Sequence, residues 1–140
     1  MPKADRISAS GVKLLQEPQL AHFVTLMADG SPQVTPVWID YDGEHILVNT
    51  WPDRAKGRNM LARPQVALDI VDPDDPFRYL AVRGRVVGAT EEGAAEHIDT
   101  LARRYMGLDR YPRHDPNRPR RLYRIVPERV VAQSRIGEIR

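Results

Sequence analysis

Cysteine is absent from this sequence of 140 residues. A chain without thiols has no disulfide framework, no thiolate nucleophile and no zinc cluster of the sulfur kind. The sequence also lacks any run that approaches the roughly 18 consecutive apolar residues of a membrane-spanning helix, and its first residues lack the apolar stretch of a signal peptide. We therefore expect a cytoplasmic protein that has no membrane partner.

Signals for hydrolytic or metal chemistry are equally scarce. No G-x-S-x-G motif occurs, and no serine stands out as an activated nucleophile. The histidines His22, His45, His97 and His114 lie far apart, without the H-x-x-x-H or H-E-x-x-H spacing of metal ligands. We interpret His22 and His45 as ordinary strand residues and predict no metal site.

The length corresponds to one domain, residues 1–140, which is long enough to bury a core but short for two domains. The formal net charge is only +2, yet arginine greatly outnumbers lysine. The planar guanidinium suits recognition of phosphate or carboxylate groups. The composition therefore favours an anionic ligand without identifying one.

The first half of the chain predicts a short helix followed by hairpins. The helix is expected over residues 10–17, with Ser10 as its N-cap. Residues 20–50 are expected to form three strands of an antiparallel meander. The Asp-Gly pairs at 29–30 and 42–43, flanked by β-branched residues, are strong hairpin signals.

The second half alternates strands and helices. Gly84 in the longest predicted strand has the spacing of a bulge or of a close backbone approach. The expected elements are a strand over 65–72, a turn at 72–76, a strand over 77–92, a helix over 91–106, and two last strands over 122–126 and 129–133. About seven short strands with two or three helices indicate a mainly β (α+β) fold and a small antiparallel barrel, because closure removes exposed sheet edges.

A predicted helix after Asp53 begins with an unusual concentration of cations. Asp53 is the expected N-cap, and Arg54, Lys56 and Arg58 crowd the first turns. Each cation is unfavourable by about 0.3–1 kcal/mol at the positive end of the helix dipole. Gly57 adds a cost of up to about 1 kcal/mol relative to alanine. An anion would relieve the repulsion, so the segment predicts a phosphate site.

Pro36 is unusual within a predicted strand. A proline cannot donate to the sheet ladder, which places it on an edge strand or at a bulge. With Trp38 beside it and the cationic helix nearby, a flat ligand would find an aromatic wall and its phosphate a socket. An ordinary edge strand with one buried tryptophan explains the same pattern equally well.

Residues 109–124 form an arginine-rich stretch with two tyrosines. Taken alone, such a stretch resembles a nucleic-acid-binding arm. No RNA-binding motif accompanies it, and the arginines do not share one helical face. We favour a solvated loop stiffened by proline, assign no ligand to it and predict no nucleic-acid partner.

The ordered motifs between Leu20 and about Gly88 resemble the pyridoxamine-phosphate-oxidase-like split-barrel superfamily, and within it the branch of coenzyme F420-dependent reductases. The pieces are D-G-x-P-x-x-x-P-V-W from Asp29, a hairpin, R-A-K-x-R-N from Arg54, and a following arginine and proline at 63–64. The resemblance implies a six- to seven-stranded antiparallel split β-barrel. It also implies a homodimer with two cofactor sites at the subunit interface.

The resemblance also implies which residues bind the cofactor. The segment after the third strand holds the phosphate, the second strand lies along the ring system, and the partner subunit contributes one further segment. The corresponding residues here are Asn49, Thr50, Arg54, Lys56, Arg58 and Asn59 for the phosphate, Thr35, Pro36, Val37 and Trp38 for the ring, and Phe77, Arg78 and Tyr79 from the partner.

The implied activity is that of an F420-dependent oxidoreductase, which transfers a hydride from reduced deazaflavin to an unsaturated small molecule such as a quinone, an enone or a tetrapyrrole. An FMN-binding oxidase or reductase is the first alternative, and a non-enzymatic cofactor- or haem-binding protein is the second. The last ten residues, VAQSRIGEIR, lack the terminal signature of FMN-dependent relatives. Because the cofactor supplies the chemistry, no acid–base pair is required, and no catalytic side chain is predicted.

Overall fold

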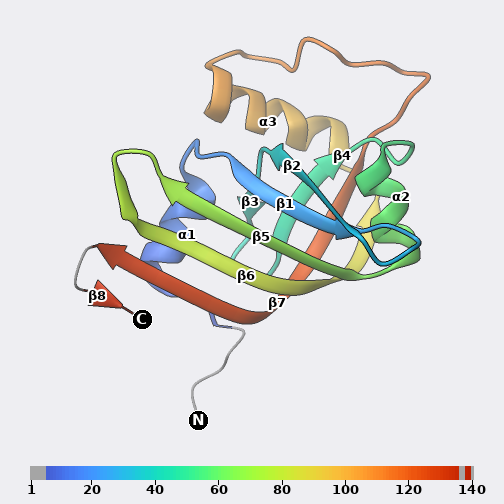
Figure 1. Cartoon of the computed structure of the whole chain (residues 1–140). Coiled ribbons are helices and arrows are strands. Elements are labelled where there is room, and N and C mark those ends of the chain that lie inside the picture. Colours follow the sequence, from blue (N-terminus) through green and yellow to red (C-terminus); the bar gives the residue numbers. More distant parts are fainter. Residues whose placement is uncertain (1–5, 136–137, 140) are drawn as a thin grey trace.

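In the computed structural model, which describes residues 6–135 and 138–139, one antiparallel sheet curls into a half-open barrel (Figure 1). The strands follow the order β2-β1-β5-β6-β7-β4-β3, and the short β8 pairs with β7. Their bounds are β1 Ala21–Leu26, β2 Pro32–Val37, β3 Asp40–Tyr41, β4 Ile46–Thr50, β5 Gln65–Asp72, β6 Asp75–Thr90, β7 Arg121–Arg135 and β8 Glu138–Ile139. The mainly β split-barrel prediction is confirmed.

The curl follows from the connection between the two ends of the sheet. Strands β2 and β3 lie at opposite ends of the hydrogen-bonded order, yet only Trp38 and Ile39 separate them in the chain. Two residues cannot cross a flat sheet of seven strands, since extended chain spans only about 3.3–3.6 Å per residue. The sheet ends must therefore approach each other, which places Trp38 at the gap of the split barrel.

Both Asp-Gly hairpins are confirmed. Gly30 and Gly43 have φ values of 87° and 98°, in the left-handed region that glycine adopts without strain. The region between residues 20 and 50 nevertheless holds four strands rather than three. It is two separate hairpins, β1–β2 and β3–β4, at the two ends of the sheet, so the prediction of a continuous meander is wrong.

The C-terminal region forms one strand where two were predicted. In β7, the residues around Pro127 continue the ladder with β6, and a register shift there leaves Glu128 as the extra residue of a bulge. The shift lies opposite Gly84, where an added Cβ would come within 2.6 Å of the Val126 carbonyl oxygen. The prediction of a bulge or close approach at Gly84 is confirmed, and the bulge explains how a proline fits within the strand.

Helices α1 (Ala9–Gln16), α2 (Ala55–Ala62) and α3 (Ala94–Met106) complete the fold. Helix α1 is capped by Ser8, whose Oγ accepts a hydrogen bond from the Gly11 N–H, and the predicted cap Ser10 is wrong. Helix α3 begins at Ala94 rather than Glu91, because Gly93 adopts φ 80° and interrupts the helical backbone. In Figure 1, α1 and α2 lie toward opposite ends of the barrel, and α3 lies along its upper side.

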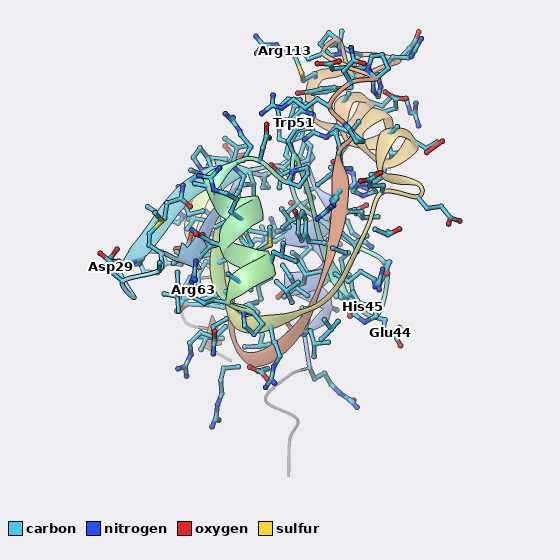
Figure 2. All side chains as sticks on the ribbon, turned by 90° about the vertical axis from the view of Figure 1, so that its right-hand side faces the viewer. Asp29, Glu44, His45, Trp51, Arg63 and Arg113 are labelled. Carbon is cyan, nitrogen blue, oxygen red and sulfur yellow. The ribbon has the colours of Figure 1, made fainter. Side chains whose placement is uncertain are left out.

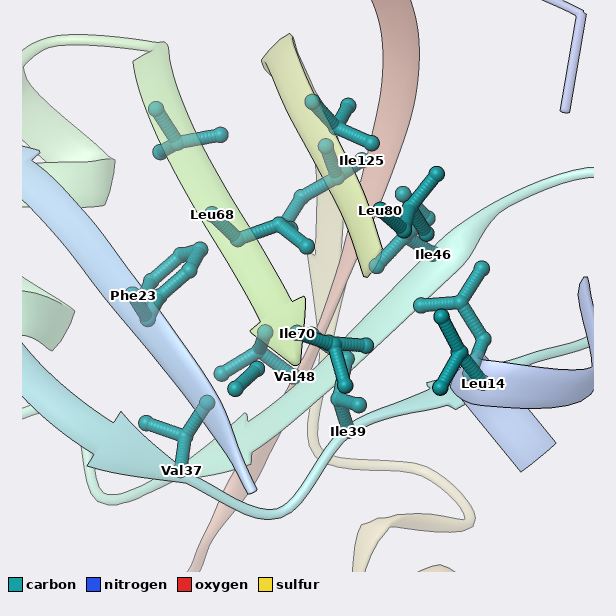
Figure 3. Close-up of a cluster of buried hydrophobic side chains, with 14 of the residues drawn as sticks. Leu14, Phe23, Val37, Ile39, Ile46, Val48, Leu68, Ile70, Leu80 and Ile125 are labelled. Atoms are coloured by element: carbon teal, nitrogen blue, oxygen red, sulfur yellow. The ribbon is translucent and has the colours of Figure 1, made fainter. Parts of the chain in front are cut away.

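The core fills the interior of the curled sheet (Figure 3). Phe23, Ile70, Leu80 and Ile125 from four different strands are fully buried, and Leu14 of α1 joins them. Several polar residues are buried as well, among them Asn49 and Thr50 at the end of β4 and Asn59 of α2. Over the described ranges, no helix combines the length and apolar character needed to cross a bilayer.

Candidate cofactor-binding site

A pocket with a volume of about 260 Å³ lies where the β2–β3 connection, the end of β4 and the start of α2 meet. It brings together seven of the residues predicted to bind a cofactor: Pro36, Val37, Trp38, Asn49, Thr50, Arg54 and Lys56. The lining also includes Leu20, Trp51, Ile98, Tyr111 and Arg120. In Figure 2, Trp51 lies between α2 and the loop that carries Arg113.

The start of α2 differs from the prediction in its cap. Arg54 occupies the N-cap position and makes no side-chain capping bond. The predicted cap, Asp53, instead pairs with Arg118, whose Nη2 lies 2.9 Å from a carboxylate oxygen. The first N–H groups of the helix therefore receive no acceptor from the cap side chain, which leaves them available to an anion.

Gly57 allows this helix start to lie against the preceding turn. An added Cβ at Gly57 would lie 2.6 Å from the Trp51 carbonyl oxygen and 3.0 Å from the Pro52 Cα. The glycine that weakens the helix by propensity is thus required by the close approach of two backbone segments. That approach fixes Trp51 beside the first turn of α2.

The cations at the pocket make no ion pair within the described part of the chain, although the charge of Arg54 helps to lower the pKa of Asp53. Burial lowers the pKa of Lys56, and the charges of Arg54 and Arg120 lower it further. None of these three side chains forms an ion pair with a described carboxylate. An anion in the pocket would reverse the repulsion, since an opposite charge within about 4–6 Å favours the charged form of lysine.

Aromatic residues form one wall of the pocket. Trp38 stacks on Tyr105 with ring centroids 5.2 Å apart and an interplanar angle of 12°, and its edge meets Tyr111. The Tyr105 hydroxyl donates to the Gln19 carbonyl and accepts from the Ile39 N–H, so the Tyr105 ring is held by its hydroxyl end. Pro36 lies on β2, which is an edge strand and so one of the two placements predicted for this proline, and Trp38 directly follows the end of the strand.

Most residues of the arginine-rich loop, residues 107–120, are exposed, but its inner side chains pack onto the pocket. The guanidinium carbons of Arg118 and Arg120 each lie 4.2 Å from the centroid of the Trp51 ring. The Tyr111 N–H donates to the Asp99 carboxylate of α3, 2.8 Å away. The interpretation of this segment as a solvated loop is therefore wrong for its inner face, because cation–π contacts and the Asp53–Arg118 pair attach it to the site.

Arg120 is the most constrained cation of the loop. Its Nε donates to the Asn49 Oδ1 over 2.6 Å, and its Nη2 donates to the Asn49 carbonyl oxygen over 3.0 Å. Burial lowers the pKa of Arg120, and Tyr111 opposes that effect. Its Nη1 is buried and has no hydrogen-bond partner among the described residues, and the same is true of the Trp51 Nε1.

Asn49 is oriented from behind by a buried network. Its Nδ2 donates to the Ala94 carbonyl oxygen and lies 3.2 Å from the His97 Nδ1. Because that nitrogen of Asn49 can only donate, the His97 Nδ1 accepts, and the Nε2–H of His97 donates to Asp40. Although burial alone would raise the pKa of Asp40, hydrogen bonds from His97, the Tyr41 N–H and Arg104 lower it, so the network holds a carboxylate.

The remaining predicted site residues do not line this pocket. Arg58 donates to the Asp53 carbonyl oxygen. Asn59 is buried and donates to the Thr25 Oγ1, so it joins α2 to β1. Thr35 is on β2, with a buried Oγ1 that has no partner among the described residues.

The segment expected from a partner subunit lies at the hairpin between β5 and β6 of this chain. Phe77 is 47% exposed. Arg78 pairs with Glu17 and Asp72, which hold its pKa above its usual value. Its charge is therefore compensated within its own subunit, and its predicted contact with a cofactor remains a prediction, as does that of Tyr79.

Sequence reasoning missed Trp51, Tyr111 and Arg120 as residues of one site. Trp51 directly precedes the cationic helix, and that proximity was an available signal. Tyr111 and Arg120 are 60 or more residues further along the chain, and only the fold brings them there. No metal-binding group of three or more histidine or acidic residues occurs in the described part of the chain.

A family model for pyridoxamine 5'-phosphate oxidase matches residues 9–134. The fold and site define a split-barrel protein with a cationic, aromatic pocket, and the match shows that the chain belongs to the pyridoxamine 5'-phosphate oxidase family. This family binds flavin-type cofactors, and it includes oxidoreductases as well as members that bind without catalysis. Comparison with curated protein sequences gave no match.

Several solved structures are similar. A protein described as F420 reductase is 33% identical with a TM-score of 0.79, over 89% of this chain and 98% of that one. HupZ from Group A Streptococcus is 21% identical with a TM-score of 0.67, over 94% and 100% of the two chains. A candidate pyridoxamine 5'-phosphate oxidase from Lactobacillus delbrueckii is 18% identical with a TM-score of 0.66, over 91% and 95%. The last two show likeness of fold alone.

The residues present fit a phosphorylated flavin or deazaflavin. Arg54, Lys56 and Arg120 lie together without an ion-pair partner beside a wall that includes Trp38. Two buried donors at the same pocket, the Arg120 Nη1 and the Trp51 Nε1, have no acceptor among the described residues. A phosphate supplies acceptors and negative charge, and a fused ring system supplies a flat face for Trp38. Both requirements of the site are met by one class of cofactor.

Proposed function

We propose that this protein is a coenzyme F420-dependent oxidoreductase that transfers a hydride from reduced deazaflavin to an unsaturated or conjugated small molecule of the quinone, enone or tetrapyrrole type. The observation that carries the proposal is the set of cations Arg54 and Lys56, without a carboxylate partner, at the start of α2 beside Trp38. Similarity to a protein described as F420 reductase favours the deazaflavin over FMN.

In this proposal, the chain binds and orients the cofactor. Arg54 and Lys56 hold the phosphate together with the first N–H groups of α2, and charge-assisted hydrogen bonds contribute about 1.5–3 kcal/mol each. Arg58 and Asn59 support the same segment, and Asn49 and Thr50 form its floor at the end of β4. When bound, a reduced deazaflavin supplies the hydride, and FMN is the alternative cofactor.

Thr35, Pro36 and Val37 of β2, and Trp38 directly after it, would hold the ring system of the cofactor. The stack of Trp38 on Tyr105 keeps this wall rigid, so the ring is held in one orientation toward the substrate. Loop 107–120 reduces the access of water from the opposite side. The proton that accompanies reduction comes from water or from a side chain near the ring.

A homodimer completes the proposed site. Val34 and Val131 are 59% and 47% exposed, and both line the outer face of the sheet around β1, β5 and β6. The same face also carries His22, Asp69, Arg83 and Arg129. A sheet face with exposed apolar residues is suited to cover by a second copy, with two-fold symmetry as the usual arrangement. The partner's segment with Phe77, Arg78 and Tyr79 then reaches the cofactor.

The test is the oxidation of reduced F420 by a small quinone. The reaction is monitored through the absorbance of oxidised F420, which returns as the reaction proceeds. We expect the protein to accelerate the reaction, and Lys56→Met to reduce the acceleration at low F420 concentration. Lys13→Met is the control, because Lys13 is an exposed lysine of α1 remote from the pocket. Failure of the wild-type protein to accelerate the reaction with any acceptor of these classes would contradict the proposed activity.

A further inference from the structure

We propose that Arg120 of the arginine-rich loop is an anion-binding residue of the pocket, and that the oxyanion it binds is the phosphate of the cofactor. The inference extends the proposed function, since it assigns a ligand to a loop segment that the family motifs do not include.

The three nitrogens of the Arg120 guanidinium have different partners. Two of them, Nε and Nη2, donate to the side chain and backbone of Asn49. The third, Nη1, is buried without a partner among the described residues. The two bonds to Asn49 hold the guanidinium in place and leave Nη1 available to a ligand. Because a buried donor without an acceptor is costly, an anion that accepts from Nη1 would be bound favourably.

Asn49 fixes the direction of that guanidinium. Its amide cannot rotate by half a turn, because its Nδ2 donates to the Ala94 carbonyl and to the His97 Nδ1. The Oδ1 must then face Arg120. A preorganised fork loses less entropy on binding an oxyanion than a flexible surface arginine would.

The surroundings of Arg120 are those of an anion site rather than of a structural ion pair. No carboxylate of the described residues pairs with Arg120, and the charges that act on it include those of Arg118, Arg54 and Lys56. The Trp51 Nε1 is a second buried donor without a described partner in the same lining. Three cations and a spare N–H match the several acceptor oxygens of a phosphate.

Arg120 already lines the pocket, so its guanidinium lies where an anion in the pocket would bind. The neighbouring Arg118 pairs with Asp53, with side-chain exposures of 38% and 62%. Exposed ion pairs contribute little stability, so the two bonds to Asn49 are the main constraint on Arg120.

The phosphate that binds Arg120 could belong to a phosphorylated cofactor or be free inorganic phosphate. Pairs of ligands that differ only in the phosphate distinguish these two sources. FMN is compared with riboflavin, and F420 with its chromophore lacking the phosphate. The proteins are the wild type, Arg120→Lys, Arg120→Met and the control Arg113→Met, which alters an exposed arginine of the same loop. Affinities come from fluorescence titration, and inorganic phosphate is followed by the shift that it causes in the thermal midpoint.

We expect Arg120→Met to weaken binding of the phosphorylated cofactor by about tenfold to a hundredfold, and that of its phosphate-free counterpart by less than about threefold. Arg120→Lys keeps the charge but loses the fork, so it falls between, and it serves as the test if Arg120→Met does not fold. Equal loss for both ligands, or no loss, would overturn the proposal. A cofactor effect without any phosphate-dependent shift identifies the cofactor as the source.

Failure of this inference is distinguishable from failure of the proposed function. If the wild type binds neither F420 nor FMN, the proposed function fails, and the thermal shift with inorganic phosphate still tests Arg120. A shift in the wild type that is absent from Arg120→Met supports the anion site, and an equal shift in both overturns it.

Discussion

Replacement of Lys56 by methionine is expected to raise the stability of the protein and lower its affinity for the cofactor. Lys56 is half-buried at the start of α2, and its pKa is lowered first by burial and then by Arg54 and Arg120. Methionine keeps most of the aliphatic contact but removes the charge. The substitution therefore separates the contribution of the charge from the contribution of side-chain packing.

The expected magnitudes follow from the neighbours of Lys56. Two like-charge pairs on and beside a helix contribute about 0.2–0.5 kcal/mol of repulsion each, so their removal raises the free energy of unfolding by about 0.4–1 kcal/mol. For a domain of this size the thermal midpoint rises by about 1–4 °C. Loss of one charge-assisted bond to phosphate weakens binding by about tenfold to a hundredfold.

The pH dependence has a definite sign. A lysine whose pKa is lower in the folded than in the unfolded state destabilises the fold while it is charged, and this penalty disappears as pH rises from the folded pKa toward the ordinary value of 10.5. The stability difference between Lys56→Met and the wild type should therefore shrink over that range. Affinity of the wild type for the cofactor should fall over the same range as the charge is lost.

Thermal unfolding without ligand and fluorescence titration with F420 or FMN measure the two quantities. Lys13→Met is the matched control, and as an ordinary surface substitution it should change stability by less than about 0.5 kcal/mol and leave affinity unchanged. The reasoning is refuted if Lys56→Met keeps wild-type affinity, or if it loses affinity and stability together.

Three further predictions concern the assembly, the aromatic wall and the close approach at α2. Light scattering at micromolar concentration should give the mass of a dimer, and a monomer would remove the proposed interface site. In a Trp51→Phe background, emission of Trp38 should be quenched on binding of F420, whereas unchanged emission at saturation would make Trp38 a core residue only. Gly57→Ala should lower the free energy of unfolding in urea by about 1–3 kcal/mol, because its Cβ would lie 2.6 Å from the Trp51 carbonyl oxygen; an unhindered site would instead be stabilised.

The hairpins and strands of the fold were predictable where local chemistry determines them. Glycine at positive φ fixes both Asp-Gly turns, and alternation of apolar residues fixes β5 at Gln65–Asp72, as predicted. The long β7 was not predictable, because Pro127 ends a strand by local rules and only the bulge opposite Gly84 accommodates it. The predictions of the N-caps of α1 and α2 were wrong for a different reason. Several candidate capping residues lie within two or three positions of each helix start, and local sequence does not select among them.

The candidate site was predictable in part. The cations of the 54–58 segment stood out because they contradict helix electrostatics, and two of them line the pocket. The contribution of the loop depends on contacts between residues far apart in sequence, such as Arg118 with Asp53 and Arg120 with Asn49. No pattern within the loop itself distinguishes Arg120 from the exposed Arg113.

Parallel titration of the wild-type protein with F420 and with FMN tests the central claim most directly. The account predicts that both ligands compete for one site per subunit, that F420 binds more tightly, and that Lys56→Met weakens F420 by at least about tenfold. Tighter binding of FMN would reassign the cofactor while keeping the pocket. Binding of F420 that is unaffected by Lys56→Met would contradict the phosphate site at the start of α2.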